Sequence, residues 1–116
     1  MSFTIVDEKS YAHSQTAVYQ AAVGAINGLE GKFESESAEE GHIEARFHKT
    51  VLKKTLGDRT YLTVDIKEND GETAVHVSCY PLNAVGQKLM FGARKGVSKT
   101  IVTWFFAHLE HRLPKA

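Results

Sequence analysis

Asp65 and His76 are the residues of this sequence whose types and spacing best suit acid–base chemistry. They flank Asp70-Gly71, a two-residue signal for a tight hairpin turn, which places them opposite each other on neighbouring strands. A carboxylate beside an imidazole orients the ring and raises its pKa, as general acid–base catalysis requires. A catalytic pair also needs an enclosing cleft, and nothing in the sequence provides one. We therefore favour a solvated strand face with ordinary cross-strand pairs over an active site. The same face would carry His42, Glu44, Arg46, His48, Tyr61, Thr63, Ser78 and Tyr80, with Tyr61 opposite Tyr80.

Residues 91–100, with the sequence FGARKGVSKT, are a candidate anion site. The glycines let backbone N–H groups converge, and the N-terminus of a predicted helix follows. A nucleotide-binding loop requires Lys directly after its last glycine, followed by Ser or Thr, whereas Val97 follows Gly96 here. This spacing disfavours nucleotide hydrolysis. Two interpretations remain. One is a capped helix start with solvated basic side chains, and the other is a looser site for an anion or a phospholipid headgroup, built from Arg94, Lys95, Ser98 and Lys99.

His108 and His111 are three residues apart on the last predicted helix, a spacing that metal sites use. The sequence places no third ligand beside them. Cys79 is turned into the core by the hairpin register, and there a thiol acts as a small apolar residue. We therefore predict no metal site and no cofactor. The absence of a Ser/His/Asp or Cys/His signature also argues against nucleophilic catalysis.

The composition is that of one ordinary globular domain, residues 1–116, because 42% of the residues are hydrophobic and 24% are charged. A net charge of zero argues against nucleic acid or an anionic membrane surface as a partner. The single cysteine excludes an internal disulfide, and the first residues, MSFTIVDEK, hold neither an apolar signal core nor a transmembrane run. We expect a cytoplasmic protein without a transmembrane segment.

Charge is unevenly distributed along the chain. Acidic residues dominate Glu30–Glu44, and basic residues dominate Arg46–Arg59 and Lys88–Lys99. We expect antiparallel neighbours to neutralise one another.

The periodicity of apolar residues predicts a strand, a helix, an antiparallel meander and a second helix. Alternation predicts the first strand over Ser2–Lys9, and an alanine-rich stripe predicts a helix over Ser14–Leu29. A broad apolar arc predicts the last helix over Val97–Leu113, ended by Pro114. The candidate residues at the ends of the first helix are Ser10 or Ser14 as the N-terminal cap and Asn27, Gly28 and Gly31 as terminators.

Two hairpins are predicted between these helices, and their turn residues set the registers. In the first, Glu39-Glu40-Gly41 forms a three-residue loop with Gly41 in the left-handed conformation. Phe33 then pairs with Phe47, and Ser35 with Ala45, so that Ile43, Ala45 and Phe47 face the core. In the second, Asp70-Gly71 places Ile66 opposite Val75, Val64 opposite Val77 and Leu62 opposite Cys79.

The remaining segments are less regular. Pro81 is expected to end the last strand, because proline has no N–H to donate to a neighbouring strand. Thr50–Asp58 is either strand or loop, and Asn83–Gly96, with its three glycines, receives no assignment.

The predicted fold class is α+β, with an antiparallel meander of about five strands and two helices packed on one face of the sheet. This arrangement resembles the helix-grip architecture, in which a curved sheet wraps the C-terminal helix. The glycine-ended, alanine-rich helix, the stretch SESAEEGHIEAR and the closing amphipathic helix look like small bacterial domains of that kind, many of unknown function. The resemblance covers most of the chain and implies no catalytic residues.

Folds of this type hold apolar ligands in a cavity between sheet and helix, so the resemblance implies such a cavity here. The candidate lining residues are Met90, Phe91, Trp104 and Phe105. By default, the aromatic residues Phe91, Trp104, Phe105 and Phe106 are core alone. Trp104 lies at the edge of the apolar arc and is also a candidate dimer contact.

We predict a non-catalytic binding or interaction domain that holds a small apolar ligand or a partner between the sheet and the last helix. Two alternatives stay open. One is a structural or regulatory homodimer formed through the last helix. The other is an enzyme that uses Asp65, His76 and the tyrosines.

Overall fold

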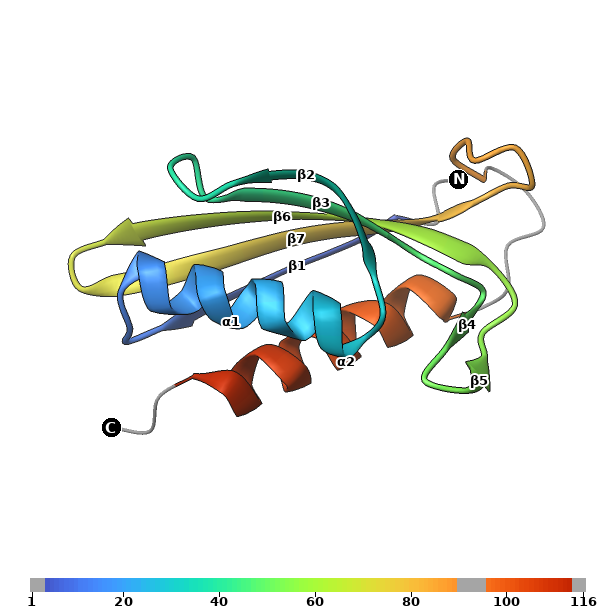
Figure 1. Ribbon diagram of the computed structural model, residues 1–116. Helices are drawn as coiled ribbons and strands as arrows, with labels where there is room; N and C mark the ends of the chain where they lie inside the picture. The colour runs from blue at the N-terminus through green and yellow to red at the C-terminus, as the bar shows by residue number, and fades with distance from the viewer. Residues whose placement is uncertain (1–3, 90–95, 114–116) are drawn as a thin grey trace.

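A long, twisted antiparallel sheet with two helices beneath one face makes up the computed structural model, which describes residues 4–89 and 96–113 (Figure 1). The strand order in the sheet is β1-β7-β6-β3-β2, and β4 and β5 form a separate small hairpin. The predicted α+β class, with both helices on one face, is confirmed. In chain order the elements are β1 (Ile5–Tyr11), α1 (Gln15–Gly28), β2 (Lys32–Ser37), β3 (His42–Phe47), β4 (Thr50–Val51), β5 (Lys54–Thr55), β6 (Arg59–Asn69), β7 (Glu72–Leu82) and α2 (Val97–Arg112).

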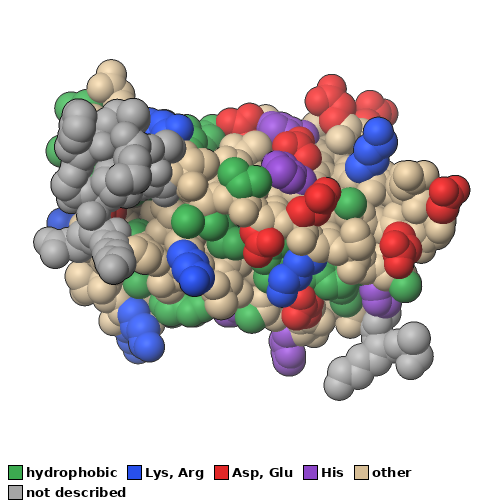
Figure 2. All heavy atoms as spheres, turned by 180° about the vertical axis from the view of Figure 1, so that it is seen from behind, with side chains coloured by type: hydrophobic (Ala, Val, Ile, Leu, Met, Phe, Trp, Pro, Cys, Tyr) green, Lys and Arg blue, Asp and Glu red, His purple; other side chains and the backbone are tan. Residues whose placement is uncertain are grey.

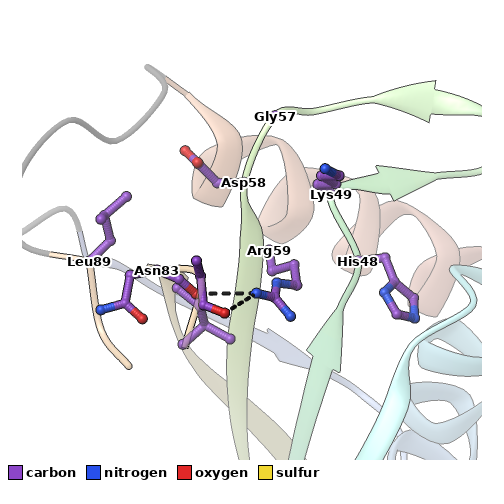
Figure 3. Close-up of a pocket in the computed structure, with 9 residues that line it drawn as sticks. His48, Lys49, Gly57, Asp58, Arg59, Asn83 and Leu89 are labelled. Atoms are coloured by element: carbon purple, nitrogen blue, oxygen red, sulfur yellow. Dashed lines mark hydrogen bonds between the residues drawn. The ribbon is translucent and has the colours of Figure 1, made fainter. Parts of the chain in front are cut away.

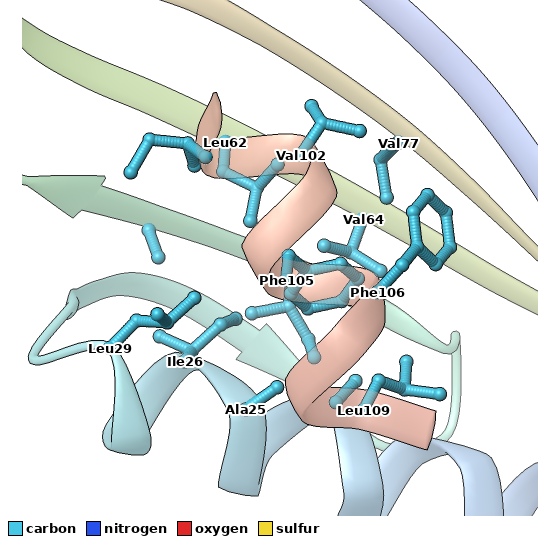
Figure 4. Packing of buried hydrophobic residues seen from close by; sticks show 14 of the residues in the cluster. Ala25, Ile26, Leu29, Leu62, Val64, Val77, Val102, Phe105, Phe106 and Leu109 are labelled. Carbon is cyan, nitrogen blue, oxygen red and sulfur yellow. The ribbon is translucent and has the colours of Figure 1, made fainter. Parts of the chain in front are cut away.

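The hydrophobic core lies between the sheet and the two helices (Figure 4). From α2, Phe105 and Leu109 are fully buried, as predicted from the apolar arc. From α1, the alanine-rich stripe lets the two helices pack closely, with Ala22 and Ala25 fully buried. Alternate residues of β3, β6 and β7 close the core from above. They include Ile43, Ala45, Leu62, Val64, Val75 and Val77, each 0% exposed.

The second hairpin has the register that its turn residues predict. Asp70-Gly71 connects β6 to β7, and the pairs Ile66–Val75, Val64–Val77 and Leu62–Cys79 are all present. However, β7 continues through Pro81, which pairs with Thr60, so the predicted end of this strand at Pro81 is wrong. Proline is tolerated there because, among the described residues, the pairing of β1 with β7 ends at Cys79, before Pro81.

The first hairpin has a different register from the predicted one. Phe33 pairs with Ala45 and Ser35 pairs with Glu44, because a bulge lies between Phe33 and Ser35. The position of β3 is set by β6, its other neighbour, which places Ala45 opposite Leu62. Edge strand β2 adjusts to that position through the bulge, while Phe33 keeps its contact with the core.

The start of α1 follows the prediction, whereas its end differs in detail. The Ser14 hydroxyl caps the helix by accepting a hydrogen bond from the Ala17 N–H at 3.1 Å. The left-handed residue after the helix is Glu30, with φ of 64°, and not a glycine. Gly31 is needed for a different reason, since a Cβ there would lie 2.7 Å from side-chain carbons of both Ile26 and Phe47.

Residues 50–58 combine both predicted alternatives. Strands β4 and β5 pair through Thr50–Thr55 and Val51–Lys54, and the residues that follow form a loop up to β6. Val51 is buried, which ties this hairpin to the end of the core.

The first strand and the last helix are joined by side chains. Strand β1 begins and ends two or more residues later than predicted, and residues 1–3 lie outside the described residues. At its end, the Tyr11 hydroxyl donates to Glu110 at 2.7 Å, and Lys9 lies 3.4 Å from the same carboxylate.

Within residues 4–89 and 96–113, neither helix is long and apolar enough to cross a membrane.

Candidate functional site

A hydrogen-bonded network crosses the outer face of the sheet, on the side away from the helices. Asp65 lies opposite His76 on β7, as predicted, but its carboxylate bonds to His42 on the other neighbouring strand, β3. The His42 Nδ1 lies 2.6 Å from Asp65 Oδ1, and its Nε2 lies 2.7 Å from Glu44 Oε2. Seen from behind, histidine side chains lie among acidic ones on this part of the surface (Figure 2).

Stacked aromatic and cationic side chains extend this network along the sheet. The Tyr61 hydroxyl donates to Glu44, and the Tyr61 ring stacks on Tyr80 with a centroid distance of 5.6 Å. Arg46 lies over Tyr61 at 5.5 Å and Lys88 over Tyr80 at 5.1 Å. Both ring faces at the ends of the stack therefore have cations beside them, as cation–π attraction favours.

The network offers little to a substrate, because its polar atoms already bind one another. Both nitrogens of His42 face carboxylates, which raises the pKa of His42, chiefly through Asp65 and then through Glu44. The protonated ring donates both of its N–H groups to these carboxylates and has no lone pair with which to accept a proton. Burial, and after it the hydrogen bond to Glu44, raises the pKa of Tyr61 to about 12. We interpret this network as a structural cross-strand cluster.

We expect this cluster to make stability depend on pH. The folded-state pKa of His42 lies above its ordinary value of 6.5, so its contribution is fully present below that value and is lost as pH rises through the folded pKa. The pKa of Glu44 is lowered, first by the bond from His42, so its contribution is lost as pH falls below its ordinary value of 4.5. The cluster therefore stabilises the folded protein most between about pH 4.5 and pH 6.5.

Replacing His42 with Asn tests this prediction. Between about pH 6 and pH 9, the wild-type protein should lose more of its free energy of unfolding, measured with urea, than the His42→Asn variant. NMR titration of the His42 ring should show its raised pKa directly. His76→Asn, a change of an exposed histidine on β7, is the matched control and should leave the pH dependence as in the wild type. Parallel curves for the wild type and His42→Asn would contradict the prediction.

A pocket of about 560 Å³ lies where β6 begins and β7 ends (Figure 3). We call it the end pocket. Arg59 is its most firmly placed cation, because its Nη2 donates to the carbonyl oxygens of Ala84 at 2.8 Å and of Asn83 at 3.4 Å. The described residues that line the end pocket are His48, Lys49, Gly57, Asp58, Arg59, Leu82, Asn83, Ala84 and Leu89.

The predicted ligand-binding residues separate into three groups. Met90 and Phe91 lie outside the described residues. Phe105 is 0% exposed and belongs to the core. Trp104 is half-buried against the core, and it also lines a shallow pocket of about 280 Å³ with Gly96, Lys99, Thr100 and Thr103.

The predicted anion-binding residues are likewise divided. Arg94 and Lys95 lie outside the described residues, and Lys99 is exposed on the first turn of α2. Ser98 is only 5% exposed, so its side chain faces the interior. A site that uses all four residues stays a prediction.

Cys79 is fully buried, as the hairpin register predicted, and burial raises its pKa to about 12. The hydroxyls of Ser98 and Thr60 lie beside the thiol and partly offset this rise. Neither hydroxyl has a regular hydrogen-bond partner among the described residues. Because the thiolate is the reactive form, we expect the Cys79 thiol to be inert in the folded protein.

A thiol-specific reagent with a coloured leaving group should therefore react with the native protein at least about a hundredfold more slowly than with the denatured protein. The absorbance of the released group measures both rates, and the denatured sample is the control for intrinsic reactivity. A native rate near the denatured one would contradict the buried position of Cys79.

His108 and His111 do not gain a third ligand in the described part of the chain, where no group of three His, Cys, Asp or Glu side chains is placed to hold a metal ion. Instead, Arg112 lies beside His108, with 3.3 Å between its Nη1 and the ring Nδ1. Burial first, and the nearby charge of Arg112 second, lower the pKa of His108. The Arg112 side chain covers Gly24 and Gly28 of α1, where a Cβ would collide with it.

The sequence matches no protein-family model and no curated protein. Solved structures nevertheless share its three-dimensional arrangement. The structure of Ara h 8.0201 matches with a TM-score of 0.64 and 10% identity, over 96% of this chain and 97% of that chain. An uncharacterised protein from Bacillus thuringiensis matches with a TM-score of 0.58 and 11% identity, over 93% of this chain and 96% of that chain.

The ginseng major latex-like protein 151 from Panax ginseng is a third similar structure, with a TM-score of 0.53 and 8% identity, over 97% of this chain and 99% of that chain. At such low identities the likeness shows the fold alone. This chain therefore has the helix-grip fold that its element order predicted.

Proposed function

We propose that this chain is a non-catalytic binding domain that holds a small organic ligand in the end pocket. The observation that carries the proposal is the pocket itself, whose volume of about 560 Å³ falls within the range of small-molecule sites. Its lining has more polar and charged side chains than apolar ones, beside an apolar part that a ligand chain could contact. Leu82, Ala84 and Leu89 supply the apolar part.

A binding role is favoured over catalysis by the side chains at hand. The described lining of the end pocket contains no hydroxyl and no thiol, which are the commonest nucleophiles. On the outer face, the carboxylates of Asp65 and Glu44 are already bonded to His42. The enzyme that the Asp65 and His76 pair suggested is therefore the weaker hypothesis.

A position of the ligand deeper between sheet and α2 has less support. The α2 side chains that face the sheet there, such as Ile101 and Phe105, are 0% exposed and fill the space. The homodimer stays a prediction. Among the described residues the large apolar side chains that are most exposed, Val6, Leu52 and Val85, come from three different segments.

Native mass spectrometry of the protein as purified from cells tests the proposal. We expect an additional small mass that is present under native conditions and lost on denaturation. Comparison of amide NMR spectra before and after removal of that molecule should then show the largest shifts at Asn83, Ala84 and Arg59. A bare monomer, with no shifts at the end pocket when candidate ligands are added, would contradict the proposal, and a doubled mass would favour the homodimer.

A further inference from the structure

We propose that the end pocket selects organic anions, that is, a carboxylate or phosphate group carried on a short apolar chain. This inference rests on the proposed binding function and names the chemical class of the ligand. Arg59 and Lys49 would bind the anionic group, and Leu82 and Leu89 would contact the apolar chain.

Arg59 is oriented before any ligand arrives. Its two hydrogen bonds to the loop use Nη2 and end on main-chain carbonyl oxygens, at 2.8 Å to Ala84 and 3.4 Å to Asn83 (Figure 3). A guanidinium has five N–H donors, so the Nε–H and Nη1 N–H groups remain to donate single hydrogen bonds to a carboxylate or a phosphate. No described carboxylate forms an ion pair with Arg59, and Figure 3 shows the Asp58 carboxylate pointing away from it. An anionic ligand would supply the missing opposite charge.

The loop that holds Arg59 is itself locked by a side chain. Asn83 Oδ1 accepts hydrogen bonds from the N–H groups of Val85 at 3.0 Å and Gln87 at 2.9 Å. The Asn83 N–H donates to the Gln87 carbonyl at 2.7 Å, and Leu89 N–H donates to Pro81 O at 2.8 Å. These bonds fix the two carbonyl groups that orient Arg59, so little ordering cost remains for the ligand.

Lys49 is placed by the small β4–β5 hairpin on the opposite rim. Its carbonyl oxygen accepts hydrogen bonds from Leu56 N–H at 2.7 Å and from Gly57 N–H at 3.3 Å. The chain therefore returns to the end pocket after β5, and the Lys49 side chain extends from this closed loop. No described carboxylate is within ion-pair distance of its ammonium group.

The charge of the rest of the surface favours entry of an anion at this end. A second pocket, of about 530 Å³, lies at the opposite end of the sheet and is lined by Glu8, Glu39, Glu40 and Asp65 among others. From behind, acidic side chains gather on the half of the molecule that lies away from the end pocket (Figure 2). An anion is therefore repelled from one end of the sheet and attracted to the other.

Amide NMR titration with simple probes tests the inference. Sodium octanoate carries both a carboxylate and an apolar chain, whereas 1-octanol has the chain without the charge, and acetate and inorganic phosphate have the charge without the chain. We expect octanoate to shift the amides of Asn83, Ala84 and Arg59 and to bind at least about tenfold more tightly than the other three probes. Octyl phosphate in place of octanoate distinguishes a phosphate ligand from a carboxylate.

Three variants identify the residues responsible. Arg59→Gln should weaken octanoate binding by about tenfold or more, and Arg59→Lys should lie between it and the wild type because it keeps the charge and loses the Nε–H and Nη1 donors. Lys49→Gln should weaken binding less. Lys67→Gln removes the same charge from an exposed position of β6 next to the other pocket, and it should bind octanoate as the wild type does. Each variant's fold is checked from its amide spectrum.

Equal binding of octanoate by the wild type and Arg59→Gln would overturn the inference, as would equal binding of 1-octanol and octanoate. In the second case, shifts at the end pocket would still support the binding function, with a neutral ligand. Binding of inorganic phosphate as tight as that of octanoate would overturn the apolar part of the inference. If none of the probes shifts an amide of the end pocket, the inference is overturned, and the native mass measurement then decides the binding function separately.

Discussion

Replacing Phe105 with Ala is expected to lower the free energy of unfolding by about 3–5 kcal/mol. The ring is fully buried and lies edge-on to Phe106, with 5.5 Å between ring centroids and an interplanar angle of 65°. Figure 4 shows it among side chains of α1, α2 and the sheet, including Ile26 and Leu62. Removing the ring would take away these contacts and leave a cavity between three rigid elements that cannot collapse to fill it.

Urea unfolding followed by circular dichroism measures this loss. Val85→Ala is the control, because Val85 is 77% exposed and its truncation should change stability by no more than about 0.5 kcal/mol. A loss for Phe105→Ala below about 1.5 kcal/mol would mean that the ring borders an existing void. That result would favour a ligand cavity between the sheet and α2, with Phe105 in its lining.

Replacing Gly41 with Ala is expected to cost about 3 kcal/mol or more, by two separate effects. Gly41 has φ of +66°, and a left-handed conformation costs a residue with a Cβ about 1–2 kcal/mol. In addition, an Ala Cβ would lie 2.1 Å from the carbonyl oxygen of Ile66, which is backbone and cannot rotate away. The hairpin would have to separate from β6 and break the 2.7 Å hydrogen bond from Ile66 N–H to Gly41 O.

Gly71→Ala separates these two effects. Gly71 also has a left-handed conformation, with φ of +82°, but a Cβ there would meet nothing within 4 Å. Its replacement should therefore cost only the conformational term, about 1–2 kcal/mol. Thermal or urea unfolding of both variants gives the comparison. Equal losses for the two variants would show that the approach of Gly41 to β6 is not tight.

The residues that form local structure made much of this fold predictable. A two-residue turn leaves a hairpin no freedom of register, so Asp70-Gly71 fixed every pair from Leu62–Cys79 to Ile66–Val75. The Ser14 cap and the apolar arc of α2 likewise depend on residues close in the sequence. The left-handed conformation of Gly41 was predicted for the same reason.

The register of the first hairpin could not be predicted from local residues alone. Its loop is longer than two residues and therefore permits several registers, and strand β3 is positioned by β6, which is distant in the sequence. The Phe33 bulge is the adjustment of an edge strand to that position. The prediction that the acidic and basic blocks neutralise one another is met in part. Glu34 of the acidic block and Arg46 of the basic block form an ion pair, 2.6 Å apart.

The candidate sites depended on tertiary structure still more. By itself, the sequence determined the helix-grip order of elements and the position of Asp65 opposite His76. It did not determine that His42 would take the Asp65 carboxylate, because the β3–β6 register is set across the intervening β4–β5 hairpin. The end pocket likewise joins residues 48–59 to residues 82–89, and neither segment has a motif of its own. Local turns and periodicity act over a few residues, whereas the packing of strands from distant segments decides which side chains share a pocket.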